Sequence, residues 1–366
     1  MPKRQQFLAG TIKLGDPLAK QELETARRKM SDGLISKACI YGAGAIGGWI
    51  GAGLAQAGCQ LSMVARGATL AALQQQGLRL NSNTSPGSPG PKAGRWSVQA
   101  SANPADLGPQ DLVVITVKAP ALLDVARHIQ PLIGPHTLVL SAMNGVPWWF
   151  FQGFGRALQG TRLQAVDATG EIGKAFSTTQ VIGCVVHASC SLDGPGQVRH
   201  QGGNQLIFGA PDGQTGERVQ QLGSLLTQAG FAAVLSQQIQ KDVWYKLWGN
   251  MTMNPISALT GATMDQILDD PLIGNFISKV MLEAKEIGAR IGTPINEQPA
   301  DRQAVTRRLG AAKTSMLQDM EAGKAIELDA LVTAVKELGA LTQTATPWTD
   351  TLLGLSRLQA KVRGLY

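Results

Sequence analysis

The segment that most constrains the fold is a glycine-rich turn that follows directly after the apolar run KACIY. Three glycines at this spacing, between a strand and a helix, are typical of a turn that binds the pyrophosphate of a dinucleotide. The first glycine allows the tight turn, the second lets the backbone approach the phosphates, and the third lets the helix pack closely on the strand. The alternative is a glycine-rich turn without a ligand. The residues expected to contact the cofactor here are Gly42, Ala43, Gly44, Ala45, Ile46 and Gly47.

Strands and helices alternate after this turn. Apolar strand segments are expected at 60–65, 111–117 and 137–142, with helices near 45–57, 68–76 and 120–130. Short units of this kind predict a parallel, doubly wound sheet. Residues 160–237 read as strands and glycine turns that close the sheet by antiparallel pairing, and beyond Gln238 only helical periodicity remains. The expected fold class is therefore α/β, with an N-terminal Rossmann-like doubly wound sheet followed by an all-helical C-terminal domain.

This division gives three expected parts: a polar N-terminal extension at 1–33, a dinucleotide-binding domain at 34–237 and a helical substrate or catalytic domain at 238–366. The Pro-, Gly- and Ser-rich segment 81–97 is expected to be an exposed loop. The run WWFF at 148–151 is expected in a core or an interface. Within the helical part, a single helical stripe is predicted from Val305, Leu309, Ala312, Met316 and Met320, and a second is predicted over 328–338 and ended by Gly339.

Composition excludes several classes of protein. No stretch approaches 18 consecutive apolar residues, so no membrane-spanning helix is expected. The formal net charge of +7 is spread along the chain and not gathered on a nucleic-acid module, which favours an anionic small-molecule ligand. The first residues lack the apolar core of a signal peptide, and the four cysteines show no metal-ligand or CxxC spacing. We therefore expect a cytoplasmic protein with free thiols and no metal, nucleic-acid or membrane partner.

A second informative segment, WYKLWGNMTMNP at 244–255, separates apolar and polar groups on one helix. Its apolar stripe, which includes Trp244 and Trp248, must be buried. Lys246, Asn250 and Asn254 are spaced i, i+4 and i+8 and form a second, polar stripe. Such a lysine can be held partly desolvated and directed at a ligand, or it can simply reach water. Asn254 before a proline also fits an N-cap with proline at the first helical position.

Three further polar residues fall at the expected carboxyl ends of strands, where ligands of open α/β sheets bind. Arg66 ends the second strand, where NAD-binding proteins carry an acidic residue, so it favours the 2′-phosphate of NADP over NAD. The alternative is an arginine that only stacks on adenine. Lys118 and Asn144 follow the next two strands and are expected to face the nicotinamide, although they could be a solvated helix start and a turn residue.

With GAGAIG, VITVKA, MNG, KLWGNMTMNP, TSMLQDM and AIELD placed in order, the chain resembles the ketopantoate reductase (2-dehydropantoate 2-reductase) family from about Lys37 onward. Members reduce the 2-keto group of ketopantoate with NADPH, giving pantoate for pantothenate synthesis, in a cleft between a Rossmann domain and a helical domain. The resemblance implies that Lys246 is the proton donor, and Asn250 and Asn254 the substrate ligands. Hydride delivery builds negative charge on the ketone oxygen, which an ammonium can stabilise and protonate.

The resemblance also assigns roles to residues elsewhere in the chain. Ser315 in KTSMLQDM matches a serine that holds the substrate carboxylate, and Glu327 in AIELD matches a glutamate near the cofactor and the substrate hydroxyl. Ser315 could equally be a helix-surface serine, and Glu327 a favourable acid in the first turn of its helix. Asn144 and Lys118 match residues around the nicotinamide and ribose, and 42–47 and Arg66 match phosphate-binding residues. Ser189, in VVHASC, falls loosely where the family makes a further cofactor contact.

Departures from the family pattern leave the substrate more open than the reaction. Some members have a further substrate asparagine soon after the asparagine-proline pair, where this chain reads LTGATMDQ. One alternative is therefore a reductase of a different branched 2-oxo acid on the same scaffold. A second is a non-catalytic NADP-binding regulatory protein, although such a protein has no chemical need for the lysine, asparagines, serine and glutamate together. A homodimer formed through WWFF or an exposed helical face is a further expectation.

Overall fold

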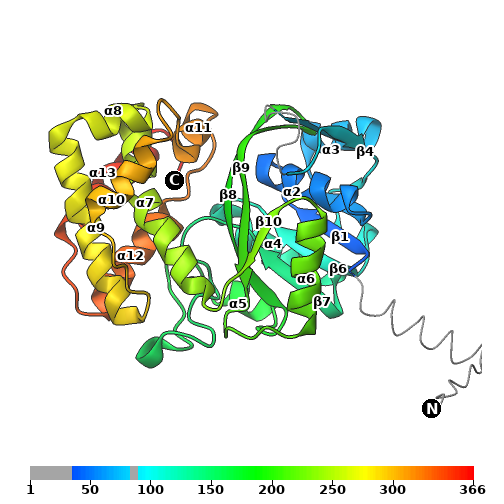
Figure 1. Ribbon diagram of the computed structural model, residues 1–366, viewed down its shortest axis with the longest axis horizontal. Helices are drawn as coiled ribbons and strands as arrows, with labels where there is room; N and C mark the ends of the chain where they lie inside the picture. The colour runs from blue at the N-terminus through cyan, green and yellow to red at the C-terminus, as the bar shows by residue number, and fades with distance from the viewer. Residues whose placement is uncertain (1–34, 83–89) are drawn as a thin grey trace, which may run out of the picture.

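The computed structural model describes residues 35–82 and 90–366. It forms a sheet-containing part and a helical part that lie side by side (Figure 1). The expected extension at 1–33 and the centre of the expected loop at 81–97 lie outside the described residues. The expected fold class is confirmed, since a Rossmann-like set of parallel strands is followed by helices alone from Ile239 onward.

Within the described residues, ten strands form one sheet in the order β4-β3-β9-β8-β7-β6-β1-β2-β5, and β10 pairs with β9. All neighbours are parallel except β8 with β9 and β3 with β4, so the expected antiparallel closure is confirmed. The strands are β1 (Lys37–Tyr41), β2 (Gln60–Val64), β3 (Leu78–Ser82), β4 (Gly94–Trp96), β5 (Gln99–Ser101), β6 (Gln110–Ile115), β7 (Ile133–Ser141), β8 (Val181–Gly194), β9 (Gln197–Gly209) and β10 (Ala232–Leu235).

The strand order reverses between β1 and β6. The chain runs from β1 to β2 on one side and then crosses back to β6 on the other, with both neighbours parallel to β1. In open α/β sheets the crevice beyond the carboxyl ends of two such strands is the place where ligands bind. The glycine turn at 42–47 begins directly at the end of β1 and therefore lies at this crevice.

The helices of the sheet-containing part cover its two faces. On one face α2 and α6 pack over an apolar core that includes Ile40, Leu112 and Leu206. On the other face the apolar core continues without a break from Val113 and Val139 into the helical part. The helices are α2 (Ala45–Gln56), α3 (Gly67–Gln76), α4 (Leu122–His128), α5 (Glu171–Ala175) and α6 (Glu217–Gln228).

The helical part is built around α7 (Ile239–Thr260), which contacts α8, α9, α11 and α13. Among the described residues, none of the helices is long and apolar enough to cross a membrane. The remaining helices are α8 (Met264–Asp269), α9 (Pro271–Ile291), α10 (Pro299–Arg307), α11 (Ser315–Glu321), the π-helical turn η5 (Asp329–Thr333), α12 (Ala334–Leu341) and α13 (Pro347–Val362).

The buried face of α7 is the predicted one. Trp244, Leu247, Trp248 and Met251 are all at most 2% exposed. The indole N–H of Trp248 donates to the carbonyl of Met281 at 2.7 Å, and that of Trp244 donates to the carbonyl of Ala284 at 3.3 Å. Both acceptors belong to α9, so these hydrogen bonds fix the rotation of α7 against its neighbour.

The predicted N-cap at Asn254 is wrong, because α7 continues through Pro255 to Thr260. A proline inside a helix removes one backbone hydrogen bond and costs about 3 kcal/mol. The residues on either side of it, from Met251 to Ala258, are all buried. Packing of this stretch in the core offsets the lost hydrogen bond, and one unbroken helix therefore carries Lys246, Asn250 and Asn254.

Three other expectations are corrected. The segment 81–97 is not wholly a loop, because β3 and β4 pair across it and β3 also pairs with β9. The stripe from Val305 to Met320 is broken, since α10 ends at Arg307, α11 begins at Ser315 and Leu309 is exposed. Gly339 does not end its helix, which runs to Leu341. The run WWFF is buried within the chain, so of its two expected positions the core is confirmed.

We predict that Trp248→Ala lowers the free energy of unfolding by about 3–5 kcal/mol, because it opens a cavity in the core and removes the hydrogen bond to α9. Leu272→Ala is the control, since Leu272 lies on α9 but is 79% exposed, and it should change stability by no more than about 0.5 kcal/mol. Urea unfolding followed by far-UV circular dichroism measures both. Equal losses in the two variants would contradict the anchoring role of Trp248.

Candidate active site

The glycine turn has the geometry of a phosphate-binding turn. Gly42 has φ +112°, and a Cβ there would lie 2.8 Å from the backbone nitrogen of Val117. A Cβ on Gly47 would lie 2.2 Å from the carbonyl oxygen of Gly42, so helix α2 reaches the strand only because residue 47 lacks a side chain. The hydroxyl of Thr116 donates a hydrogen bond to the carbonyl oxygen of Gly42 at 2.7 Å, which stabilises the turn.

Gly44 differs from its neighbours, because a Cβ built on it would meet nothing within 4 Å. The space beside it is open, and the first backbone N–H groups of α2 lack partners within the helix. Open space beside unpaired N–H donors at a helix N-terminus fits a pyrophosphate group. The residues present at 42–47 therefore fit a dinucleotide cofactor.

Arg66 stands at the end of β2, immediately before α3, as the sequence predicted. Its guanidinium forms an ion pair with Asp124 of α4 at 2.6 Å, and its side chain is 66% exposed. The pairing raises the pKa of Arg66, which stays charged. An exposed ion pair is weak, on the order of 0–1 kcal/mol, so an incoming phosphate could compete for this guanidinium.

Lys246 joins the two parts of the molecule. Its ammonium donates to the side-chain oxygen of Asn144 at 2.8 Å, and to the carbonyl oxygen of Val186 on β8 at 2.7 Å. An ammonium has three N–H donors, so one remains for a ligand. Both acceptors are uncharged, and they fix the direction of the side chain without neutralising its charge.

The surroundings of Lys246 disfavour its charged form. Burial is the largest cause, and the nearby guanidinium of Arg302 acts in the same direction, while Cys184 and Glu327 oppose them. Together they lower the pKa of Lys246 to about 8. A lysine with a pKa near neutrality can release and regain a proton at physiological pH, which is what a general acid requires.

Asn250 and Asn254 follow Lys246 on the same face of α7. Asn254 is only 5% exposed. Within residues 35–82 and 90–366, no side-chain hydrogen bond connects either amide to the protein. Neither amide is among the fully buried polar atoms without a partner, so both keep some access to solvent and can donate to or accept from a bound ligand.

A second cluster of charges bridges the two parts. The ammonium of Lys118, which follows β6, lies 2.8 Å from a carboxylate oxygen of Asp319 and 3.3 Å from one of Glu327. Glu327 is buried and also accepts a hydrogen bond from the backbone N–H of Ala119 at 2.9 Å. Burial opposes the charge on Lys118, but the two carboxylates outweigh it and raise the pKa of Lys118.

Two predicted residues lie apart from these groups. Ser315 is exposed at the first position of α11, where Thr314 caps the helix. Ser189 is exposed on β8 and donates to the side chain of Gln201 at 2.9 Å. No hydrogen bond or ion pair links either serine to Lys246 or Glu327 in the described part of the chain.

Sequence reasoning missed three residues near the predicted ones. Asp319 holds Lys118 from α11, Arg302 of α10 approaches α7, and His187 follows Val186 on β8. Desolvation by the surrounding protein, with the charges of Lys246 and Arg302, lowers the pKa of His187 to about 4, so this imidazole is neutral near pH 7. His187 carried a weak signal in the sequence, because it follows an apolar run, whereas Arg302 and Asp319 lie on helix faces with no distinguishing pattern.

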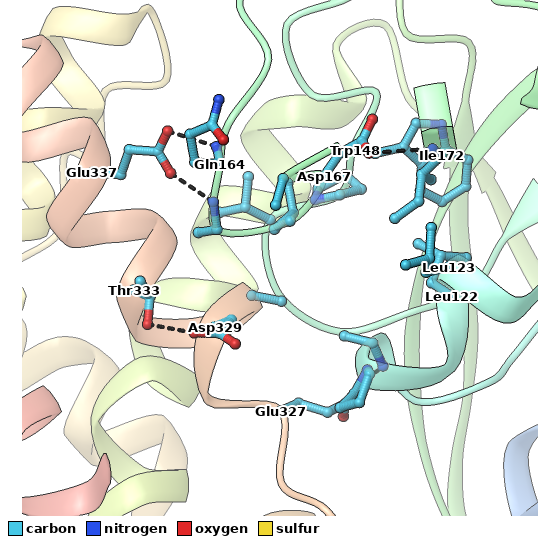
Figure 2. Close-up of a pocket in the computed structure, with 18 of the residues that line it drawn as sticks. Leu122, Leu123, Trp148, Gln164, Asp167, Ile172, Glu327, Asp329, Thr333 and Glu337 are labelled. Atoms are coloured by element: carbon cyan, nitrogen blue, oxygen red, sulfur yellow. Dashed lines mark hydrogen bonds between the residues drawn. The ribbon is translucent and has the colours of Figure 1, made fainter. Parts of the chain in front are cut away.

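A cavity of about 730 Å³ opens beside this site, between α4, the loop 143–148, the segment 164–169 and the stretch 326–340. Figure 2 shows Leu122, Leu123 and Ile172 on one side of the cavity, Asp329 and Thr333 on the other, and Glu327 at its lower edge. Of the predicted residues, Asn144 and Glu327 line it, whereas Lys246 and the glycine turn do not. The cavity thus adjoins the candidate active site but does not contain it.

The fold and site define a Rossmann-type, dinucleotide-dependent oxidoreductase. The family described as "Ketopantoate reductase PanE/ApbA" matches residues 38–213, and its C-terminal counterpart matches residues 238–360. A 2-dehydropantoate 2-reductase from Mesorhizobium japonicum is 44% identical over 90% of this chain and 99% of its own. The chain belongs to the ketopantoate reductase family.

Solved structures agree with this assignment. A putative ketopantoate reductase from Ralstonia solanacearum MolK2 has a TM-score of 0.83 and 53% identity, over 91% of this chain and all of its own. A D-mandelate dehydrogenase, solved with NADH and anilino(oxo)acetate, has a TM-score of 0.75 over 90% of this chain and all of its own. Its 21% identity supports a shared fold only.

We predict that Lys246 titrates with a midpoint near pH 8 in the folded protein. The side chain loses its positive charge as the pH rises through this value, because burial disfavours the ammonium. Nuclear magnetic resonance of ¹³C-dimethylated lysines measures the midpoint, and Lys246→Arg assigns the signal by its loss. A midpoint near 10.4, the value of a free lysine, would show that the ammonium is fully solvated.

Proposed function

We propose that this protein reduces the 2-keto group of 2-dehydropantoate to pantoate, a step of pantothenate synthesis, with NADPH as the reductant and Lys246 as the proton donor. The observation that carries the proposal is the Lys246 ammonium, which two neutral acceptors orient while one N–H stays free. The Mesorhizobium japonicum relative, named 2-dehydropantoate 2-reductase, supports the same reaction for this chain.

The proposed cofactor is NADPH, which supplies a hydride to the ketone carbon when it is bound. Residues 42–47 would hold its pyrophosphate, and Arg66 would exchange part of its contact with Asp124 for the 2′-phosphate. Lys118 and Ser189 are proposed to contact the cofactor from β6 and β8. Lys118 already binds two carboxylates, so a ribose hydroxyl would join an existing cluster.

Lys246 would donate its free N–H to the ketone oxygen and transfer the proton as negative charge develops there. Its lowered pKa makes this transfer easier, since the proton is held less tightly than on a free lysine. Asn144 would keep the ammonium in place and adjoin the nicotinamide. Glu327, which binds the backbone N–H at 119, would orient Lys118 and the substrate hydroxyl.

The unpartnered amides of Asn250 and Asn254 would bind the polar groups of the acid, and Ser315 would reach its carboxylate from the start of α11. Ser315 would need to approach the other residues, since it is exposed in this structure. The homodimer expected from the sequence stays a prediction.

The reaction is tested by initial rates with ketopantoate, 2-oxoisovalerate and pyruvate, each with NADPH and with NADH. We predict that kcat/KM is highest for ketopantoate with NADPH. A higher value for another branched acid would favour the second reductase considered above. An equal kcat/KM with NADH and with NADPH would overturn the role of Arg66. The absence of any turnover would favour a non-catalytic nucleotide-binding protein.

The role of Lys246 is tested with Lys246→Ala. We predict that kcat falls by about 10²–10⁴-fold, the usual contribution of a general acid, while the dissociation constant of NADPH changes little. Lys241→Ala is the matched control, because Lys241 lies on the same helix with an exposed side chain. Stopped-flow absorbance and fluorescence titration measure turnover and binding. Unchanged turnover in Lys246→Ala would show that Lys246 is not the proton donor.

A further inference from the structure

Arg302 reaches from α10 across the surface of α7 beside Lys246. Its guanidinium carbon lies 5.7 Å from the ring centre of Tyr245, the residue before Lys246. One turn further along α7, a Cβ on Gly249 would lie 2.6 Å from a terminal guanidinium nitrogen of Arg302. The missing side chain at residue 249 therefore leaves the room that the guanidinium occupies.

This guanidinium lacks an anionic partner within the described residues. One terminal nitrogen donates to the hydroxyl of Thr306 at 3.0 Å, on the same helix. The Nε atom is buried and has no hydrogen-bond acceptor, and no described carboxylate forms an ion pair with the group. Burying a charged donor without a partner is unfavourable, so the position favours a ligand that supplies negative charge.

The guanidinium shares its surroundings with groups from both sides of the site. Its charge lowers the pKa of Lys246 on α7 and that of His187 on β8. The neighbourhood thus holds two cations and a neutral imidazole, and the ammonium's two hydrogen-bond acceptors are uncharged. An anion that enters here is attracted by both cations at once.

We propose that Arg302, in addition to Ser315, binds the carboxylate of the 2-oxo acid substrate while Lys246 contacts the adjacent ketone. This inference rests on the proposed function. In a 2-oxo acid the carboxylate and ketone carbons are bonded to each other, so the group that binds the carboxylate must lie next to the group that contacts the ketone. Arg302 lies over Tyr245 and Gly249, on the face of α7 adjacent to the face that carries Lys246. A guanidinium matches a carboxylate with two parallel hydrogen bonds.

The test compares wild type with Arg302→Gln and Arg302→Lys. Calorimetry measures the dissociation constant of ketopantoate in the dead-end complex with NADP⁺, and initial rates give kcat and KM with NADPH. We predict that Arg302→Gln weakens ketopantoate binding and raises KM by about 100-fold or more, and that Arg302→Lys restores part of the loss. Affinity for NADPH should stay unchanged.

Two controls separate carboxylate binding from a structural role. Arg307→Gln changes another arginine of α10, one that pairs with Asp269 at the surface, and it should behave as wild type. Ketopantoyl lactone keeps the ketone but has no free carboxylate. If Arg302 acts on the carboxylate, wild type and Arg302→Gln should handle the lactone within about threefold of each other, whereas a distorted site would lose activity on both compounds.

The outcomes distinguish this inference from the proposed function. If wild type reduces ketopantoate and Arg302→Gln binds ketopantoate as tightly as wild type does, the inference alone is overturned. Wild type that binds ketopantoate through Arg302 but reduces no 2-oxo acid would overturn the proposed function and support the inference. Loss of lactone and ketopantoate activity to the same extent in Arg302→Gln would assign Arg302 a structural role and overturn the inference. Failure of wild type to bind ketopantoate would overturn both.

Discussion

The candidate site depends on the way α7 is held. Trp244 and Trp248 bury one face of the helix and donate their indole N–H groups to carbonyls of α9, which fixes the rotation of α7. Helical spacing then places Lys246 and both asparagines on a single face, and Lys246 reaches across to Asn144 and β8. Since the apolar core is continuous between the two parts, the same packing that stabilises the fold also positions the ammonium against the sheet.

Charge is distributed unevenly around the site. Lys118 is neutralised by Asp319 and Glu327, which connect the sheet to the helical part. Lys246 and Arg302 have no such carboxylate partners among the described residues. The cluster around Lys118 therefore connects the two parts of the molecule as well as lying at the proposed cofactor site, whereas Lys246 and Arg302 favour the binding of an anion. The lowered pKa of Lys246 follows from the same arrangement, because burial and the neighbouring guanidinium both disfavour the charged ammonium.

The sequence predicted the features that depend on local spacing. The glycine turn after β1, the buried face of α7 and the polar stripe with Lys246 all follow from patterns within a few residues. Contacts between distant segments could not be predicted: β3 pairs with β9, and Arg302 reaches α7 from α10. The N-cap proposed at Asn254 was wrong for the same reason, since the local proline signal was outweighed by burial of the whole stretch in the core.

The most direct test of the central claim is a crystal structure of the protein with NADP⁺ and ketopantoate. We predict that the ketone oxygen lies within about 2.6–3.2 Å of the Lys246 ammonium, the reach of a hydrogen bond to a general acid, with the nicotinamide facing the ketone carbon. A ketone oxygen well beyond hydrogen-bond reach of Lys246, with another donor or a water in that position, would contradict the account.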